Sequence, residues 1–180
     1  MHTITCWHWR KRVLTISADA FGRPSFRFVV SRPAHFLAFG FGIGLIPVAP
    51  GTFGTLAAFP LHAWLRPLLG ERNFALLLPV LFLLGVWACH VTGRRLGVHD
   101  HGGMVWDETV AFLIVLYFTP AAPMWQAFAF LLFRLFDILK PMPIRYFDRT
   151  LRNGLGVMFD DLLAAFFTLL CLAGWKLVYG

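Results

Sequence analysis

The chain has 180 residues, of which 58% are hydrophobic and 14% are charged. Soluble domains carry roughly 45–50% apolar and about 25% charged residues, so this chain has too little charge to cover a water-exposed surface. The composition excludes an ordinary water-soluble domain and favours a membrane protein.

The formal net charge is +7, which suits either a nucleic acid or an anionic membrane surface. The basic side chains precede the first long apolar region or lie in loops between apolar runs, as the positive-inside rule predicts for cytoplasmic segments. They include Arg10, Lys11, Arg12, Arg23, Arg27, Arg32, Arg94, Arg95, Lys140, Arg145, Arg149 and Arg152. The sequence has no zinc-finger spacing, basic heptad region or ribonucleoprotein signature, so we expect membrane lipids and no nucleic acid as partners.

We divide the chain into a tail and a membrane domain at about residue 33. Residues 1–33 are basic and aromatic, and we interpret them as a cytoplasmic tail, whereas residues 34–180 form the membrane-embedded domain. The run FLAFGFGIGLI at 36–46 is shorter than the roughly 20 residues of a membrane span, and the Pro- and Gly-rich segment PVAPGTFGT follows it. This pattern predicts a re-entrant or broken helix.

The rest of the chain alternates apolar runs with polar loops. Two runs, 53–69 and 74–91, are separated by the turn Gly-Glu-Arg-Asn and predict a helical hairpin. After a polar loop at 92–103, further candidate helices cover 105–119, 124–139 and 159–178. We therefore predict an all-α, polytopic membrane helical bundle with about four spans plus the re-entrant or broken helix, and with both basic loops on the cytoplasmic side.

The acidic residues are few and unevenly placed. Of nine Asp and Glu residues, seven fall in the second half of the chain. Asp107 and Glu108 lie at the start of one predicted helix, Asp137 lies near the end of the next, and Asp160 and Asp161 start the last. Because these helices alternate in direction, all five carboxylates are expected at one side of the membrane.

Acidic residues inside membrane segments usually face a cavity, a cation or each other. Five like charges would repel unless a cation neutralised them, and hard oxygen ligands suit magnesium, which keeps water and substrate phosphate in its remaining positions. We therefore predict all five as magnesium (Mg2+) ligands and catalytic residues. The alternative is that Arg134, Lys140 and Arg145 pair with the carboxylates to hold helices together, and for Arg134 and Asp137, three residues apart, the two interpretations weigh equally.

Two further segments are suited to binding an anion. In PVAPGTFGT, Thr52 or Thr55 can cap a helix while contacting phosphate, although a simple helix break is the commoner meaning of such a segment. In KPMPIR, two prolines hold Lys140 and Arg145 at the ends of a stiff turn, where they can clamp a phosphate. Together with Arg134 these are the predicted phosphate-binding residues.

The polar loop contains the triplet His99, Asp100 and His101 before two glycines. Zinc binding is one interpretation, but adjacent ligands lack the helical i, i+4 spacing of zinc enzymes. A supporting or proton-handling role is favoured, and an ordinary solvated loop is the alternative.

Four stretches of the sequence resemble the phosphatidylglycerophosphatase A family in their order and spacing: GIGLIPVAPGTFGTLAAFP, GVHDHGGMVWDETV, FRLFDILKPMPIRYFDR and GLGVMFDDLLA. The resemblance implies a magnesium-dependent membrane phosphatase that converts phosphatidylglycerophosphate to phosphatidylglycerol. It also implies that the acidic motif residues of the family fall on the same five carboxylates, with Lys140 in the adjoining proline turn. The sequence departs from the family pattern at three positions. Ala111 and Asn153 stand where the family usually has glycine, and Met142 stands where it usually has tryptophan.

The expected reaction is attack of water, activated by one carboxylate, on a phosphate neutralised by Lys140 and Arg145. The expected location is the bacterial inner membrane, with the site facing the cytoplasm. A cation- or proton-coupled transporter is the main alternative, since broken helices and intramembrane carboxylates also occur there. Transporters place such groups near the bilayer midplane, whereas these lie near helix ends, which favours a lipid headgroup enzyme.

Overall fold

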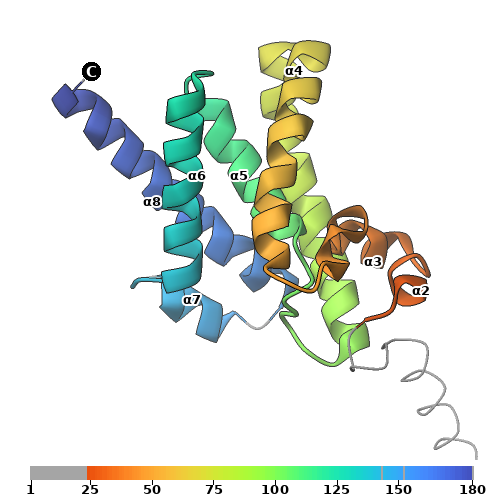
Figure 1. Ribbon diagram of the computed structural model, residues 1–180. Helices are drawn as coiled ribbons and strands as arrows, with labels where there is room; N and C mark the ends of the chain where they lie inside the picture. Colours follow the sequence, from red (N-terminus) through yellow and green to blue (C-terminus); the bar gives the residue numbers. More distant parts are fainter. Residues whose placement is uncertain (1–23, 143, 152, 180) are drawn as a thin grey trace, which may run out of the picture.

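The computed structural model describes residues 24–142, 144–151 and 153–179. Over these ranges the chain forms helices and no strand, so the all-α prediction is confirmed for the described residues (Figure 1). The elements are α2 (Phe26–Val29), α3 (Pro33–Ala38), η1 (Gly40–Leu45), α4 (Pro50–Leu96), α5 (Trp106–Phe118), α6 (Pro123–Leu139), α7 (Ile144–Thr150) and α8 (Gly154–Tyr179).

Helix α4 is folded back on itself at Gly70. There φ is 73° and ψ is 164°, a conformation that glycine adopts without steric cost. The rings of His62 and Phe74, which flank this break, lie 5.5 Å apart, and Figure 1 shows the two arms, 50–69 and 71–96, running in opposite directions. The predicted hairpin is confirmed.

The number of membrane spans is confirmed only in part. Within the described residues, α4 and α8 are long and apolar enough to cross a membrane. The helices predicted at 105–119 and 124–139 are present as α5 and α6, but they have 13 and 17 residues. At 1.5 Å per residue they measure about 20 and 25 Å, less than the roughly 30 Å hydrocarbon core. Two candidate spanning helices, one of them a hairpin, are therefore shown, and the predicted four spans are not.

Some helices extend beyond the apolar runs from which they were predicted, because the residues that cap the helix ends lie outside these runs. Helix α4 continues to Leu96 and ends at Gly97, whose N–H donates to the carbonyl of Gly93. Helix α8 begins at Gly154 rather than at 159, and the Asn153 side chain accepts a 3.0 Å hydrogen bond from the N–H of Gly156. Helix α7 lies between the predicted helices at 124–139 and 159–178, in a segment that was predicted as a basic loop.

The segment before α4 is a broken helix, as predicted. Helix α3 ends at Ala38, and η1 contains the non-helical residues Phe41 and Gly42, both with positive φ. The predicted tail lies mostly outside the described residues, but its last part packs on the bundle, since Phe28 in α2 is buried and stacks on His35 at 4.4 Å. The boundary at residue 33 and the cytoplasmic placement of the tail stay predictions.

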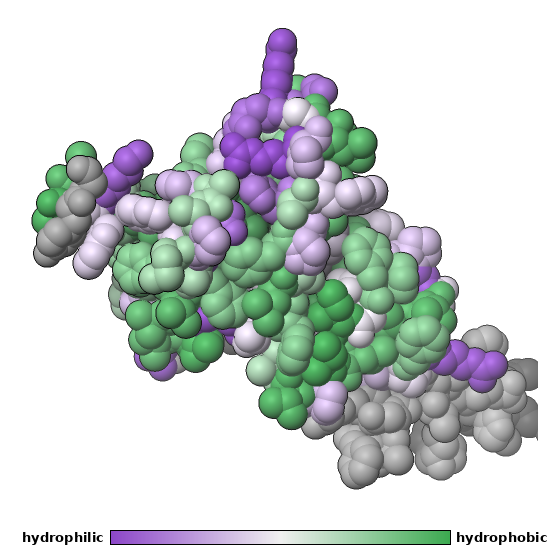
Figure 2. All heavy atoms as spheres, turned by 45° about the horizontal axis from the view of Figure 1, so that its top comes forward, coloured by the Kyte–Doolittle hydropathy of each residue, from purple (hydrophilic) through white to green (hydrophobic). Residues whose placement is uncertain are grey.

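Helix α5 is the centre of the hydrophobic core. Phe112 is fully buried, and its ring lies 5.2 Å from Phe59 of α4 and 5.4 Å from Phe133 of α6. The outer surface is also apolar, with broad hydrophobic areas in Figure 2 and exposed side chains such as Leu83 and Leu177. An apolar core inside an apolar surface is the pattern of a protein surrounded by lipid.

Candidate active site

Helix ends that carry the acidic residues meet at one end of the bundle. Asp107 and Glu108 lie in the first turn of α5, Asp137 lies in the last turn of α6, and Asp160 and Asp161 lie near the start of α8. Figure 1 shows these three helix ends, with the start of α4, at the end of the molecule nearest α7. The alternation of helix directions produces this convergence, as expected from the sequence.

Three of the five carboxylates form a compact group. One oxygen from each of Asp107, Glu108 and Asp161 lies within 4.8 Å of the others. Asp107 and Asp161 are only 6% and 3% exposed, and Asp107 Oδ1, Glu108 Oε2 and Asp161 Oδ2 have no hydrogen-bond partner. Burying an unpartnered carboxylate oxygen costs several kcal/mol unless a cation compensates for the lost water. The buried, all-oxygen donor set therefore fits a divalent ion such as magnesium.

The other two carboxylates are paired with cations. Asp137 forms an ion pair with Arg134 on the same helix and lies within hydrogen-bonding reach of Asp161. Asp160 forms an ion pair with Lys140, and its Oδ1 accepts a hydrogen bond from the N–H of Asp161. The sequence left metal binding and ion pairing open for these residues. The structure shows ion pairs at Asp137 and Asp160, whereas Asp107, Glu108 and Asp161 each keep one buried oxygen with no hydrogen-bond partner.

The predicted phosphate-binding residues are not all brought together. Arg134 lies in the site, with its Nη1 4.0 Å from Glu108 Oε1, and Lys140 ends α6 in the left-handed conformation at φ 42°. Thr55 is buried and donates to the carbonyl of Gly51 at 2.9 Å, so its hydroxyl proton is already engaged. Thr52 is half-buried in the first turn of α4, and Arg145 is exposed on α7.

The polar loop lies beside η1, and the ring centroids of Phe39 and His101 are 6.0 Å apart. Nδ1 of His101 accepts a 3.0 Å hydrogen bond from the N–H of Gly103, and burial lowers the pKa of His101, an effect that the charge of Asp100 partly opposes. The group of potential metal ligands found among the described residues contains no histidine, so the zinc interpretation has no support. Sequence reasoning also missed Gly54, where a Cβ would lie 2.8 Å from Val105 of the neighbouring segment. The spacing of glycines at the start of α4 was the available signal for such close packing.

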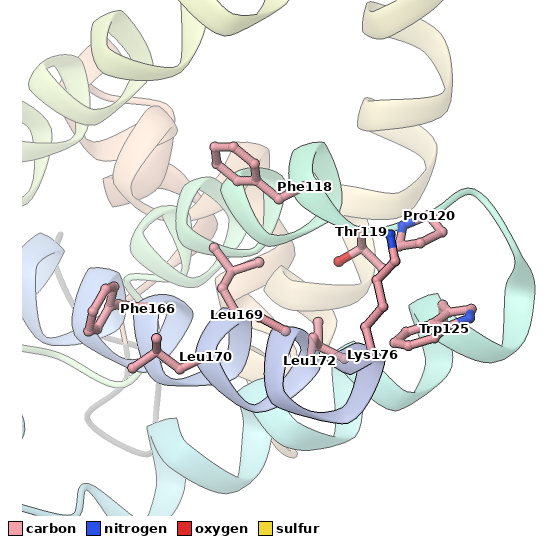
Figure 3. Close-up of a pocket in the computed structure, with 10 residues that line it drawn as sticks. Phe118, Thr119, Pro120, Trp125, Phe166, Leu169, Leu170, Leu172 and Lys176 are labelled. Atoms are coloured by element: carbon pink, nitrogen blue, oxygen red, sulfur yellow. The ribbon is translucent and has the colours of Figure 1, made fainter. Parts of the chain in front are cut away.

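Cavities occur at both ends of the bundle. A cavity of about 440 Å³ between α5, α6 and α8 is lined by apolar side chains together with Thr119 and Lys176 (Figure 3). Its lining runs along α8 from Phe166 to Lys176, which lie five and fifteen residues beyond Asp161, and includes none of the five carboxylates. A second cavity, of about 640 Å³, is lined by Pro50, His101 and Gly103 and adjoins the start of α4.

Comparison with known proteins identifies the family. The family model for phosphatidylglycerophosphatase A matches residues 36–176. A phosphatidylglycerophosphatase A from Haemophilus influenzae is 52% identical over 139 residues, which cover 77% of this chain and 85% of that protein. One from Escherichia coli is 44% identical over 139 residues, or 77% of this chain and 80% of that protein. A Bacteroides thetaiotaomicron protein named as a candidate phosphatidylinositol-3-phosphatase is 35% identical over 165 residues, or 88% of this chain and 99% of that protein.

No solved structure matches the chain. The relatives are bacterial proteins named as lipid phosphatases, and with the apolar helices they indicate a membrane enzyme and give no support to a transporter. The chain belongs to the phosphatidylglycerophosphatase A family of lipid phosphatases.

Proposed function

We propose that this chain hydrolyses phosphatidylglycerophosphate to phosphatidylglycerol and inorganic phosphate, with magnesium held by Asp107, Glu108 and Asp161. The observation that carries the proposal is the group of three buried carboxylates within 4.8 Å, each with an unpartnered oxygen. The names of the Haemophilus and Escherichia relatives support the choice of lipid.

When bound, a divalent ion at this group supplies positive charge that stabilises the phosphoryl group during transfer. The residues of the chain supply positioning and further charge. Arg134 and Lys140, held by Asp137 and Asp160, present cations beside the carboxylates, where they neutralise the non-bridging oxygens of the phosphate.

Hydrolysis needs an activated water and a leaving group. A carboxylate of the cluster accepts a proton from the attacking water as the new P–O bond forms in line with the bond that breaks. The glyceryl oxygen leaves and takes up a proton, which gives phosphatidylglycerol. The buried position of the carboxylates strengthens each of these charge interactions, because the local dielectric constant is low.

Basic residues at the same end of the bundle support the proposed orientation in the membrane. Arg94 and Arg95 lie in the last turn of α4, and Lys140 ends α6. By the positive-inside rule this end faces the cytoplasm of the bacterial inner membrane, where the lipid phosphate reaches the site from the inner leaflet.

The substrate is tested by phosphate release from defined lipids with the purified protein in mixed micelles containing magnesium. We expect release from phosphatidylglycerophosphate at a rate well above that from phosphatidylinositol 3-phosphate and lysophosphatidic acid. Faster release from either of the other lipids would overturn the substrate assignment. Asp107→Asn should abolish release, whereas Glu71→Gln, at an exposed carboxylate beside the Gly70 turn, should not.

A further inference from the structure

Gly51, in the first turn of α4, lies directly against the carboxylate of Glu108. A Cβ at this position would lie 2.2 Å from Glu108 Oε1 and 3.4 Å from Arg134 Nη1. The first distance is well below van der Waals contact. The carboxylate therefore occupies the space that any other side chain at position 51 would need.

The backbone of Gly51 does not itself require glycine. It is helical, and Gly51 is absent from the residues with positive φ in the described part of the chain. Glycine inside a helix costs up to about 1 kcal/mol relative to alanine. Space for Glu108 is thus the physical reason for glycine at this position.

Arg134 lies on the same side of Glu108 as the added Cβ would. The carbonyl of Gly51 accepts from the Thr55 hydroxyl at 2.9 Å, and that hydroxyl accepts from Arg134 Nη1 at 3.4 Å. The same Nη1 lies 4.0 Å from Glu108 Oε1 and is ion-paired with Asp137. A methyl group at position 51 would enter the space beside these hydrogen bonds, and the Glu108 carboxylate, at the end of a flexible side chain, is the group that would have to shift.

We propose that Gly51 is a positioning residue that holds the Glu108 carboxylate at the distance from Asp107 and Asp161 at which the three bind a divalent ion. The proposal rests on the proposed function, since it takes Glu108 as a metal ligand. Gly51 acts only through Glu108 and contacts neither ion nor lipid.

The test is a double-mutant cycle of Gly51→Ala and Glu108→Asp, because aspartate is one methylene shorter and leaves room for the added methyl group. The affinity for Mn²⁺, measured by its electron paramagnetic resonance signal without substrate, is the first readout. Gly51→Ala should weaken Mn²⁺ binding by about tenfold or more, as loss of a residue that orients a metal ligand usually does. In the Glu108→Asp background the same change should weaken binding less than twofold.

Gly174→Ala in α8 is the matched control, because a Cβ there meets no atom within 4 Å. It should leave Mn²⁺ affinity and kcat unchanged. Wild-type affinity in Gly51→Ala, or an equal loss in both backgrounds, would overturn the proposal. If Gly51→Ala does not fold, the double variant should, since the clash is relieved, and a double variant that also fails to fold would overturn it too.

If the proposed substrate assignment is wrong, the measurements will show a different pattern. Wild-type protein that binds Mn²⁺ but releases no phosphate from phosphatidylglycerophosphate would remove the substrate assignment, while the coupling in Mn²⁺ affinity would still support the role of Gly51.

Discussion

Replacing Asp161 with asparagine removes one negative charge from the group of three carboxylates while keeping the shape of the side chain. In the absence of divalent ions the variant should be more stable than the wild type, because less like charge is buried at the start of α8. In the presence of magnesium this difference in stability should shrink or reverse, because the variant has lost a ligand.

The size of the effect follows from the geometry. The carboxylate oxygens lie within 4.8 Å of one another, and two unit charges at that distance repel by about 3.5 kcal/mol at an effective dielectric constant of about 20. Asp161 has two such neighbours. Arg134 and Lys140 and small side-chain shifts relieve part of the repulsion, so we expect a gain of about 1–3 kcal/mol in the ion-free protein.

Thermal unfolding in detergent, with EDTA and over a series of magnesium concentrations, measures both effects. Magnesium at 100 times its Kd should stabilise the wild type by about 2.7 kcal/mol and Asp161→Asn far less. Glu71→Gln serves as the control and should respond to magnesium as the wild type does. A variant that is less stable than the wild type in EDTA, and equally stabilised by magnesium, would show that Asp161 has a structural role and is not a ligand of the ion.

Two further predictions concern stability. Lys140→Met removes the cation that pairs with the buried Asp160 and should cost about 2–3 kcal/mol of unfolding free energy, less than a fully buried pair because the Lys140 side chain is 25% exposed. Adding Asp160→Asn should restore most of this loss in denaturant titrations, and a purely additive double variant would contradict the pairing. Burial, with smaller effects of Arg32 and Arg95, lowers the pKa of His35 to about 4 from 6.5. The folded protein therefore binds fewer protons than the unfolded chain between these values, so stability should fall as the pH drops from about 6.5 to about 4 and then level off. His35→Gln should flatten this profile, and an unchanged profile would refute the assignment.

The parts of the fold that follow from local patterns were predictable. The hairpin required only two apolar runs and the turn after Gly70, and the meeting of five carboxylates at one end required only that successive helices alternate in direction. The family resemblance rested on the same acidic and proline-rich stretches, and comparison with known proteins confirmed it.

Other features depend on tertiary contacts that no local pattern reveals. The pairing of Asp137 with Arg134 and of Asp160 with Lys140 depends on the directions of the two cationic side chains, and the packing of α6 against α8 sets these directions. The role of Gly51 depends on a single close approach between α4 and α5. The lengths of α5 and α6 were visible in the predicted runs 105–119 and 124–139, and only the interpretation of these runs as full membrane spans lacks support.

The most direct measurement is the rate of phosphate release from phosphatidylglycerophosphate as a function of magnesium concentration, for the wild type and Asp107→Asn. The wild type should lose activity in EDTA and regain it with saturable dependence on magnesium, and Asp107→Asn should stay inactive at every concentration. Full wild-type activity in EDTA, or wild-type activity in Asp107→Asn, would contradict a metal-assisted reaction at these carboxylates.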